Sequence, residues 1–217
     1  TTSALSFPGL KKAEACRAPG LPERGREATP ARVCIWPPVC RQRYTAGFLP
    51  LLRFFTMSQK PPVTQAIRML RAHRVAWTDH LYAYEEKGGT RVSARELGVD
   101  EHAVIKTLIM HDEQKRPLVV LMHGDCEVST KNLARQLAVK SIEPCPPAIA
   151  DKHSGYQVGG TSPFGTRQAM PVYMEASIAE LPRIYLNGGK RGYLIGVDPA
   201  DVVRVLQPTL VNVAVAG

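Results

Sequence analysis

Apolar residues recur with the periods of regular secondary structure only beyond about residue 57. After Pro61, the apolar residues Val63, Ile67 and Leu70 fall on one face of a helix. This segment is therefore predicted to be helical, and regular structure is expected to begin there.

The runs 104–110 and 118–122 give the clearest strand pattern, because both are apolar and rich in residues that favour β structure. The charged segment 111–117 separates them, which is typical of a hairpin with a long loop. Further strands are predicted at 75–84, 171–174, 184–186 and 193–197, and further helices at 93–97, 129–137 and 199–206. Strands and helices intermingle without a regular βαβ repeat. The pattern predicts the α+β class, as a single mixed domain over residues 57–217 with a largely antiparallel central sheet and surrounding helices.

Residues 1–56 differ in composition, since they hold seven prolines and show no sustained period. The chain begins at Thr1, whereas Met57 directly precedes the first patterned segment. We therefore expect residues 1–56 to be a disordered or non-native extension, with Met57 as the natural start. A transit peptide is the competing interpretation, because the segment contains arginines and few acids.

The positive charge is concentrated in the same segment. The chain has 28 Lys and Arg against 19 Asp and Glu, a net charge of +9, yet residues 1–56 hold nine of the basic and three of the acidic side chains. Residues 57–217 thus carry only +3. Such a charge is low for a domain that binds nucleic acid alone, because affinity rises with the number of phosphates neutralised.

Several classes of protein are excluded by what the sequence lacks. No stretch reaches the ~18 consecutive apolar residues of a membrane-spanning helix. The five cysteines form no CxxC pair and have no histidine at zinc-finger spacing. We expect free thiols, a cytosolic location, and neither a metal nor another cofactor.

Lys106 lies inside an otherwise apolar strand. It is either a charge that protects a sheet edge from aggregation or a cation aimed at a phosphate or a developing oxyanion.

Two glycine-rich segments allow a structural and a functional interpretation. The stretch 155–165 has four glycines in eleven residues. It is either a tight loop or a set of backbone N–H donors that approach a ligand closely, although no Walker sequence is present. The stretch 188–192 is either a hairpin turn or a pair of cations on a nucleic-acid backbone.

No conventional nucleophile is evident. Ser162 precedes a proline and lacks a Gly-x-Ser-x-Gly context, and the acidic neighbours of Cys126 disfavour its thiolate. The six histidines show no catalytic spacing and are interpreted as surface or satisfied residues.

Three segments in register resemble one family: Lys106-Thr107-Leu108, the Gly-Gly-Thr-Ser-Pro-Phe-Gly loop at 159–165 and Gly-Gly-Lys-Arg-Gly at 188–192. They are similar to the YbaK/EbsC family of aminoacyl-tRNA deacylases, which are relatives of the editing domain in bacterial prolyl-tRNA synthetases. The resemblance covers residues 57–217.

The resemblance implies hydrolysis of the ester in mischarged tRNA, most typically Cys-tRNA(Pro), with tRNA and prolyl-tRNA synthetase as partners. An Ala-tRNA(Pro)-type deacylase and a non-catalytic tRNA-binding adaptor remain as alternatives. An aminoacyl ester is already activated, so the substrate's own thiol or ribose hydroxyl can serve as the nucleophile.

The implied catalytic residues are Lys106, which holds the phosphate or ribose end, and Gly159 and Gly160, whose N–H groups polarise the carbonyl. The family's tyrosine on the early strand corresponds to Tyr82, with Tyr84 as the alternative. Glu175 stands where the family has an aspartate. The implied substrate-binding residues are Tyr82, Thr161, Ser162, Pro163, Gly165, Glu175, Gly188, Lys190 and Arg191.

Overall fold

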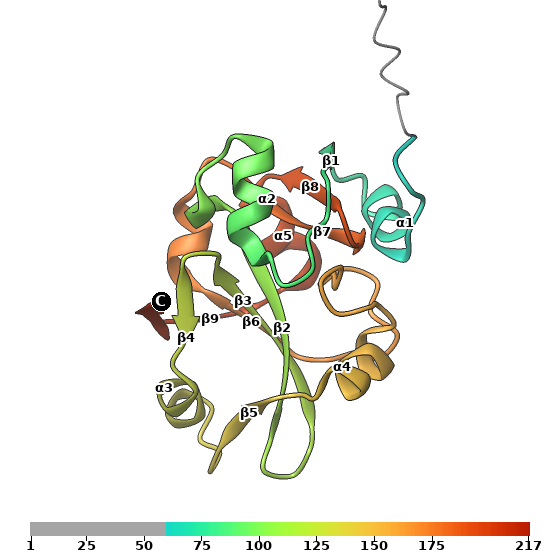
Figure 1. The fold of residues 1–217 in the computed structure, drawn as a ribbon. Coiled ribbons are helices and arrows are strands. Elements are labelled where there is room, and N and C mark those ends of the chain that lie inside the picture. The colour runs from blue at the N-terminus through green and yellow to red at the C-terminus, as the bar shows by residue number, and fades with distance from the viewer. Residues whose placement is uncertain (1–59) are drawn as a thin grey trace, which may run out of the picture. The chain divides into compact units, whose positions relative to one another are not determined.

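The structure is a computed structural model that describes residues 60–217, so the prediction for residues 1–56 lies outside the described residues (Figure 1). Its α-helices are α1 (Gln65–Ala72), α2 (Gly89–Leu97), α3 (Thr130–Gln136), α4 (Pro147–Ser154) and α5 (Pro199–Leu206), with short 3₁₀ helices η1 (Glu101–Ala103) and η2 (Ala176–Glu180). Its strands are β1 (Trp77–Leu81), β2 (Ile105–Asp112), β3 (Pro117–His123), β4 (Cys126–Val128), β5 (Ile142–Pro144), β6 (Val172–Glu175), β7 (Ile184–Lys190), β8 (Tyr193–Val197), β9 (Thr209–Val211) and β10 (Ala214–Ala216).

The central sheet has five strands in the order β5-β2-β3-β6-β9. Strand β2 is antiparallel to β3 and β5, whereas β6 is parallel to both β3 and β9. The parallel pairing of β3 with β6 is allowed by the long connection between them, which contains α3 and α4. A second sheet, β1-β8-β7, is entirely antiparallel, and β10 pairs with β4. The α+β class is confirmed, and the pairings of β2 and of the second sheet are antiparallel as expected, whereas both pairings of β6 are parallel.

The central sheet separates two apolar cores, because successive side chains of a strand point to opposite faces. Ile105 and Ile109 of β2 pack on one face, with α1, α5 and the second sheet. Met110 and the partly buried Leu108 pack on the other face, with α3 and the C-terminal segment. Thr107 therefore shares the face of Ile105, and Lys106 shares that of Leu108.

The stronger patterns predicted their elements well. The 104–110 and 118–122 runs form the β2–β3 hairpin, and α5 begins at Pro199 with the Asp198 carboxylate as its cap. Helix α1 begins at Gln65 rather than near Pro61, because Thr64 caps it, and Val63 is 56% exposed. Helix α4 was missed because its eight residues show little apolar periodicity. The three-residue strands β4, β5, β9 and β10 were missed because they are too short to carry a period.

The helices of residues 60–217 were compared with the requirements for a membrane-spanning segment. None of these helices combines the length and the apolar character needed to cross a bilayer.

Candidate functional site

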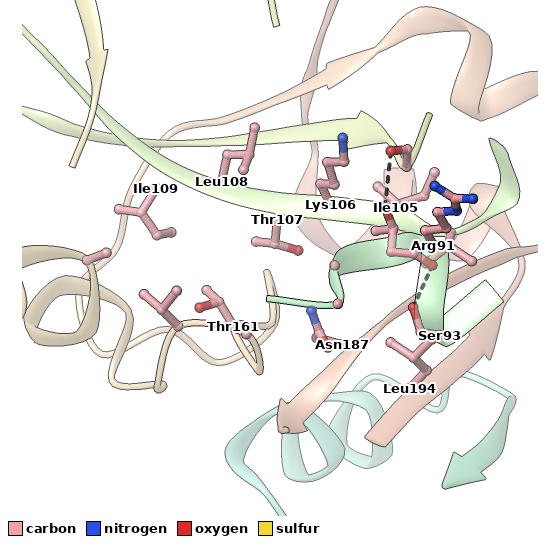
Figure 2. A pocket seen from close by; sticks show the side chains of 18 of the residues that line it. Arg91, Ser93, Ile105, Lys106, Thr107, Leu108, Ile109, Thr161, Asn187 and Leu194 are labelled. Atoms are coloured by element: carbon pink, nitrogen blue, oxygen red, sulfur yellow. Dashed lines mark hydrogen bonds between the residues drawn. The ribbon is translucent and has the colours of Figure 1, made fainter. Parts of the chain in front are cut away.

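A cavity of about 500 Å³ lies between α2, β2, the loop after α4 and strand β7. This volume is typical of a small-molecule site. Figure 2 shows the lining side chains, which come from segments far apart in the sequence. The cavity is thus a product of the tertiary fold and the natural candidate for the functional site.

One wall of the cavity is the exposed edge of β2. Strand β5 pairs with β2 only from Met110 to Asp112. The backbone carbonyl of Ile109 accepts a hydrogen bond from Cys145 N at 3.0 Å on that side. Because backbone groups two residues apart point the same way along a strand, the N–H and C=O of Thr107 face this edge beyond the reach of β5. The edge offers backbone donors and acceptors to a ligand.

Lys106 lines the cavity, but its side chain leaves β2 on the face opposite Thr107 (Figure 2). Its Nζ donates a hydrogen bond to the carbonyl oxygen of Cys126 at 3.0 Å. An ammonium has three N–H donors, so two remain for other acceptors. Lys106 is a cation at the boundary of the cavity rather than at its centre.

The two glycines predicted to act together behave differently. Gly159 lines the cavity and has φ +90°, a left-handed conformation that favours glycine. Gly160 donates its N–H to the carbonyl of Gln157 at 2.9 Å, and a Cβ there would lie 2.7 Å from Arg191 N. Gly160 therefore permits close packing against the β7–β8 turn, and its N–H is already engaged.

The rest of the glycine loop divides between the cavity and the core. Thr161 lines the cavity, whereas the side chain of Ser162 is fully buried and its Oγ accepts from Phe164 N. The hydroxyl of Tyr156 donates to the Phe164 carbonyl at 2.6 Å, and Gly165 lies against α1. Ser162, Pro163 and Gly165 anchor the loop and do not line the cavity.

Both candidate tyrosines line the cavity. Burial, followed by the nearby Tyr84, raises the pKa of Tyr82 above its ordinary value. Tyr84 is 37% exposed, and the Arg191 guanidinium lies 5.2 Å above its ring. Arg191 also donates through Nε to the Val158 carbonyl at 2.8 Å. Arg191 thus braces the glycine loop next to the cavity.

The remaining predicted residues lie elsewhere. Gly188 packs against the ring of Tyr193, and Lys190 is exposed on the β7–β8 turn. Glu175 is 5% exposed, and its carboxylate accepts from Val213 N at 2.8 Å and Ala214 N at 2.9 Å. The structure does not bring Glu175 to the cavity, because this carboxylate holds the C-terminal segment.

Polar residues that the sequence analysis did not select line the same cavity. The Oγ1 of Thr107 is the one buried side-chain N or O atom of residues 60–217 without a hydrogen-bond partner. Thr107, Thr161 and Asn187 surround one space in Figure 2. Asn187 precedes a register shift between β7 and β8. A polar residue at an apolar position of a strand, such as Thr107 between Ile105 and Ile109, was the available signal.

Among the two cysteines and the one cluster of possible metal ligands in residues 60–217, only Cys145 lines the cavity. Burial raises the pKa of the Cys145 thiol, which lines the cavity. Burial and Asp125 also raise the pKa of Cys126. His102, Asp125 and Cys126 offer three ligand atoms within 4.8 Å of one another, but these residues do not line the cavity, and His102 Nδ1 is 2.9 Å from Asp125 Oδ1. Neither thiol is activated as a nucleophile.

Comparisons with known proteins agree with these features. Residues 86–205 match the aminoacyl-tRNA editing domain. EbsC of Enterococcus faecalis, provisionally named a Cys-tRNA(Pro)/Cys-tRNA(Cys) deacylase, is 28% identical over 143 residues, which are 65% of this chain and 87% of that protein. A proline–tRNA ligase of Streptococcus agalactiae is 29% identical over 105 residues, which are 48% of this chain and 17% of the ligase.

Solved structures share the fold. The hypothetical protein APE2540 superimposes with a TM-score of 0.65 and 18% identity, covering 70% of this chain and all (100%) of that one. A protein provisionally described as a trans-editing enzyme for prolyl-tRNA synthetase gives a TM-score of 0.62 and 15% identity, covering 71% of this chain and 99% of the other. The matched residues contain β2, the glycine loop and β7, which build most of the cavity. The resemblance to the YbaK/EbsC family is thereby confirmed, and the chain belongs to the family of aminoacyl-tRNA editing domains.

Proposed function

We propose that this protein is a trans-editing deacylase that hydrolyses the ester of mischarged tRNA, with Cys-tRNA(Pro) as its principal substrate. The observation that carries the proposal is a cavity bounded by Lys106, Gly159 and the free edge of β2 in a chain of the editing-domain family. The cavity has room for an aminoacyl group and part of the terminal nucleoside. Lys106 and Arg91 supply positive charge at its boundary.

The chemistry requires no nucleophile from the protein. The sulfur of a cysteinyl ester attacks its own carbonyl carbon, a C–S bond forms, and the C–O bond to the ribose breaks. The ribose oxygen takes up a proton, and water then opens the resulting thiolactone to free cysteine. The raised pKa of Cys126 and of Cys145 supports this assignment, because a protonated thiol is a poor nucleophile.

Two groups of the protein act on the reacting ester. The N–H of Gly159 donates to the carbonyl oxygen as negative charge develops there, a role that the engaged N–H of Gly160 does not share. Lys106 holds a phosphate or ribose oxygen with an N–H that Cys126 does not use. Lys106 thus positions the ester and the Gly159 N–H stabilises the developing charge, and neither contact activates an enzyme nucleophile.

Prolyl-tRNA synthetase is the proposed partner. Residues 57–217 carry a net charge of only +3, which favours an assembly in which another protein holds the tRNA body. The similarity to proline–tRNA ligase supports this choice. Deacylation at physiological salt should therefore rise when the synthetase is added.

The test is a deacylation panel of cysteinyl-, alanyl- and prolyl-tRNA of the proline acceptor under single-turnover conditions. We expect hydrolysis of the cysteinyl ester and protection of the prolyl ester. Rapid hydrolysis of the alanyl ester with a stable cysteinyl ester would instead establish an Ala-tRNA(Pro)-type deacylase. Binding without hydrolysis of any ester would support the adaptor alternative. The departure at Glu175 from the family's aspartate is weak support for an adaptor, because the Glu175 carboxylate makes a structural contact outside the cavity.

A further inference from the structure

The most informative feature that the proposed chemistry leaves unused is the hydroxyl of Thr107. Buried polar atoms in folded proteins almost always have a partner, and exceptions call for an explanation. In residues 60–217, Thr107 Oγ1 is the one buried side-chain N or O atom that has none. Because Thr107 lines the cavity, a bound ligand is the natural partner for its hydroxyl.

Thr107 does not stand alone at this end of the cavity. Figure 2 shows Thr161 and Asn187 around the same space. Thr161 is only 5% exposed, Asn187 is partly buried, and both line the cavity. A carboxamide and two hydroxyls can each donate and accept, so the group suits a ligand atom that also does both.

The surroundings indicate that this ligand atom carries no positive charge. Apolar side chains, including Ile105, Ile109 and Ala150, line the same part of the fold. The single carboxylate among the lining residues is Glu101, and its Oε1 accepts from the hydroxyl of Thr90 at 2.8 Å at the start of α2. Burying an ammonium beside Thr107 without a carboxylate would be costly. A neutral hydroxyl or thiol fits this position.

We propose that Thr107, Thr161 and Asn187 form a specificity subsite that binds the hydroxyl or thiol on the β-carbon of a small aminoacyl group. This inference rests on the proposed deacylase function and goes beyond it by assigning the residues that select the amino acid. It also predicts that seryl groups bind at this subsite, although only the cysteinyl thiol supplies the nucleophile of the proposed reaction. A site built to hydrogen-bond a substrate hydroxyl rejects an analogue that lacks it, because the polar groups are then left unpaired.

The experiment measures binding separately from chemistry. The probes are adenosines that carry a seryl, cysteinyl or alanyl group through a 3′-amide in place of the ester, titrated into the full chain by calorimetry. We expect the seryl and cysteinyl probes to bind at least about 10-fold more tightly than the alanyl probe, the scale of one net hydrogen bond in a buried site. The first two probes distinguish a hydroxyl preference from a thiol preference.

Variants identify the residues responsible. Thr107→Val and Asn187→Leu keep the side-chain volume and remove the polar groups, so each should weaken the seryl probe about 10-fold and leave the alanyl probe nearly unchanged. Thr107→Ser keeps the hydroxyl and should restore seryl binding. Thr209→Val, on the exposed strand β9, is the matched control, and thermal melts check the folding of each variant.

The results separate the two proposals. Equal wild-type affinity for seryl and alanyl probes, or variants that weaken all three probes alike, would overturn the subsite, because the three residues would then bind a part common to all probes. Deacylation of mischarged tRNA would survive that result. If no probe binds and no mischarged tRNA is hydrolysed, the proposed function and the subsite fail together.

Discussion

Successive side chains of β2 point to opposite faces of the sheet, and this alternation determines where the Lys106 ammonium lies. Lys106 and Thr107 are adjacent in the sequence, yet their side chains leave β2 on opposite faces. One polar group therefore lies within the cavity, while the other borders it and bonds to Cys126 O. The two residues are expected to have separable roles, one in substrate selection and one in positioning.

We expect Lys106→Ala to lower the single-turnover deacylation rate by at least about 10²-fold, the effect of removing one electrostatic contact to the reacting group. Stability should change little, because the substitution empties little core volume. Lys131→Ala, on the exposed face of α3, is the matched control and should retain activity. Wild-type turnover in Lys106→Ala would remove this residue from the site.

Cys145 provides a second prediction at the scale of a residue. Its thiol lines the cavity, so alkylation would block substrate entry whether or not the sulfur is a nucleophile. Cys145→Ser is the sharper experiment, and because burial keeps this thiol protonated we expect only a modest loss of turnover. Near-complete loss in a folded variant, detected by circular dichroism, would assign a covalent mechanism to Cys145.

At the scale of the element, the glycine loop depends on close contact with the β7–β8 turn. A Cβ on Gly160 would lie 2.7 Å from Arg191 N and from the Lys190 carbonyl carbon, both of which are backbone atoms. We expect Gly160→Ala to destabilise the fold by about 1–3 kcal/mol through overpacking and to reduce deacylation by displacing Gly159 and Thr161.

Gly98→Ala is the control for that substitution. Gly98 ends α2 with φ +65°, and a Cβ there meets no atom within 4 Å. Backbone strain should cost about 1–2 kcal/mol, while the cavity stays intact. If both variants lost stability and activity in proportion in urea unfolding and deacylation assays, the loop would have no special role.

The same loop has a pH-dependent anchor. Burial raises the pKa of Tyr156 to about 12, and its hydroxyl donates to the Phe164 carbonyl. The folded state holds this proton more tightly than the unfolded state, whose tyrosine titrates near ~10. This contribution to stability is therefore complete below about pH 10 and is lost progressively as the pH rises toward about 12.

We expect the free energy of unfolding of the wild type to fall across that interval, as measured in urea at fixed ionic strength. Tyr156→Phe should be less stable at neutral pH, because the Phe164 carbonyl loses its donor, yet should show a weaker decline at alkaline pH. An unchanged decline would assign the alkaline transition to another group, such as Tyr193, whose pKa is also raised by burial.

At the scale of the whole molecule, residues 60–217 account for the cores and the cavity. We expect a chain that begins at Met57 to match the full chain in melting temperature and deacylation rate, because residues 1–56 lack an apolar period for packing. Thermal melts and the deacylation assay with both chains check this. A drop of several degrees on truncation would show that the removed segment stabilises the domain.

The sequence by itself determined the elements with strong periods. The apolar runs of β2 and β3 and the helix at 199–206 follow from local patterns along the chain. The glycine segments and Lys106 also showed where close backbone approach and an unusual charge would occur. These features were enough to indicate the fold class and the family.

Only the tertiary structure decided which of these residues share a cavity. Thr107, Thr161 and Asn187 are separated by as many as 80 residues in the sequence, and they come together because β7 and the glycine loop pack beside the edge that β5 leaves uncovered. Glu175 was assigned to the site by its position in the sequence, but its carboxylate faces the C-terminal segment. Local patterns specify secondary structure, whereas the choice of neighbours depends on long-range packing that no local period encodes.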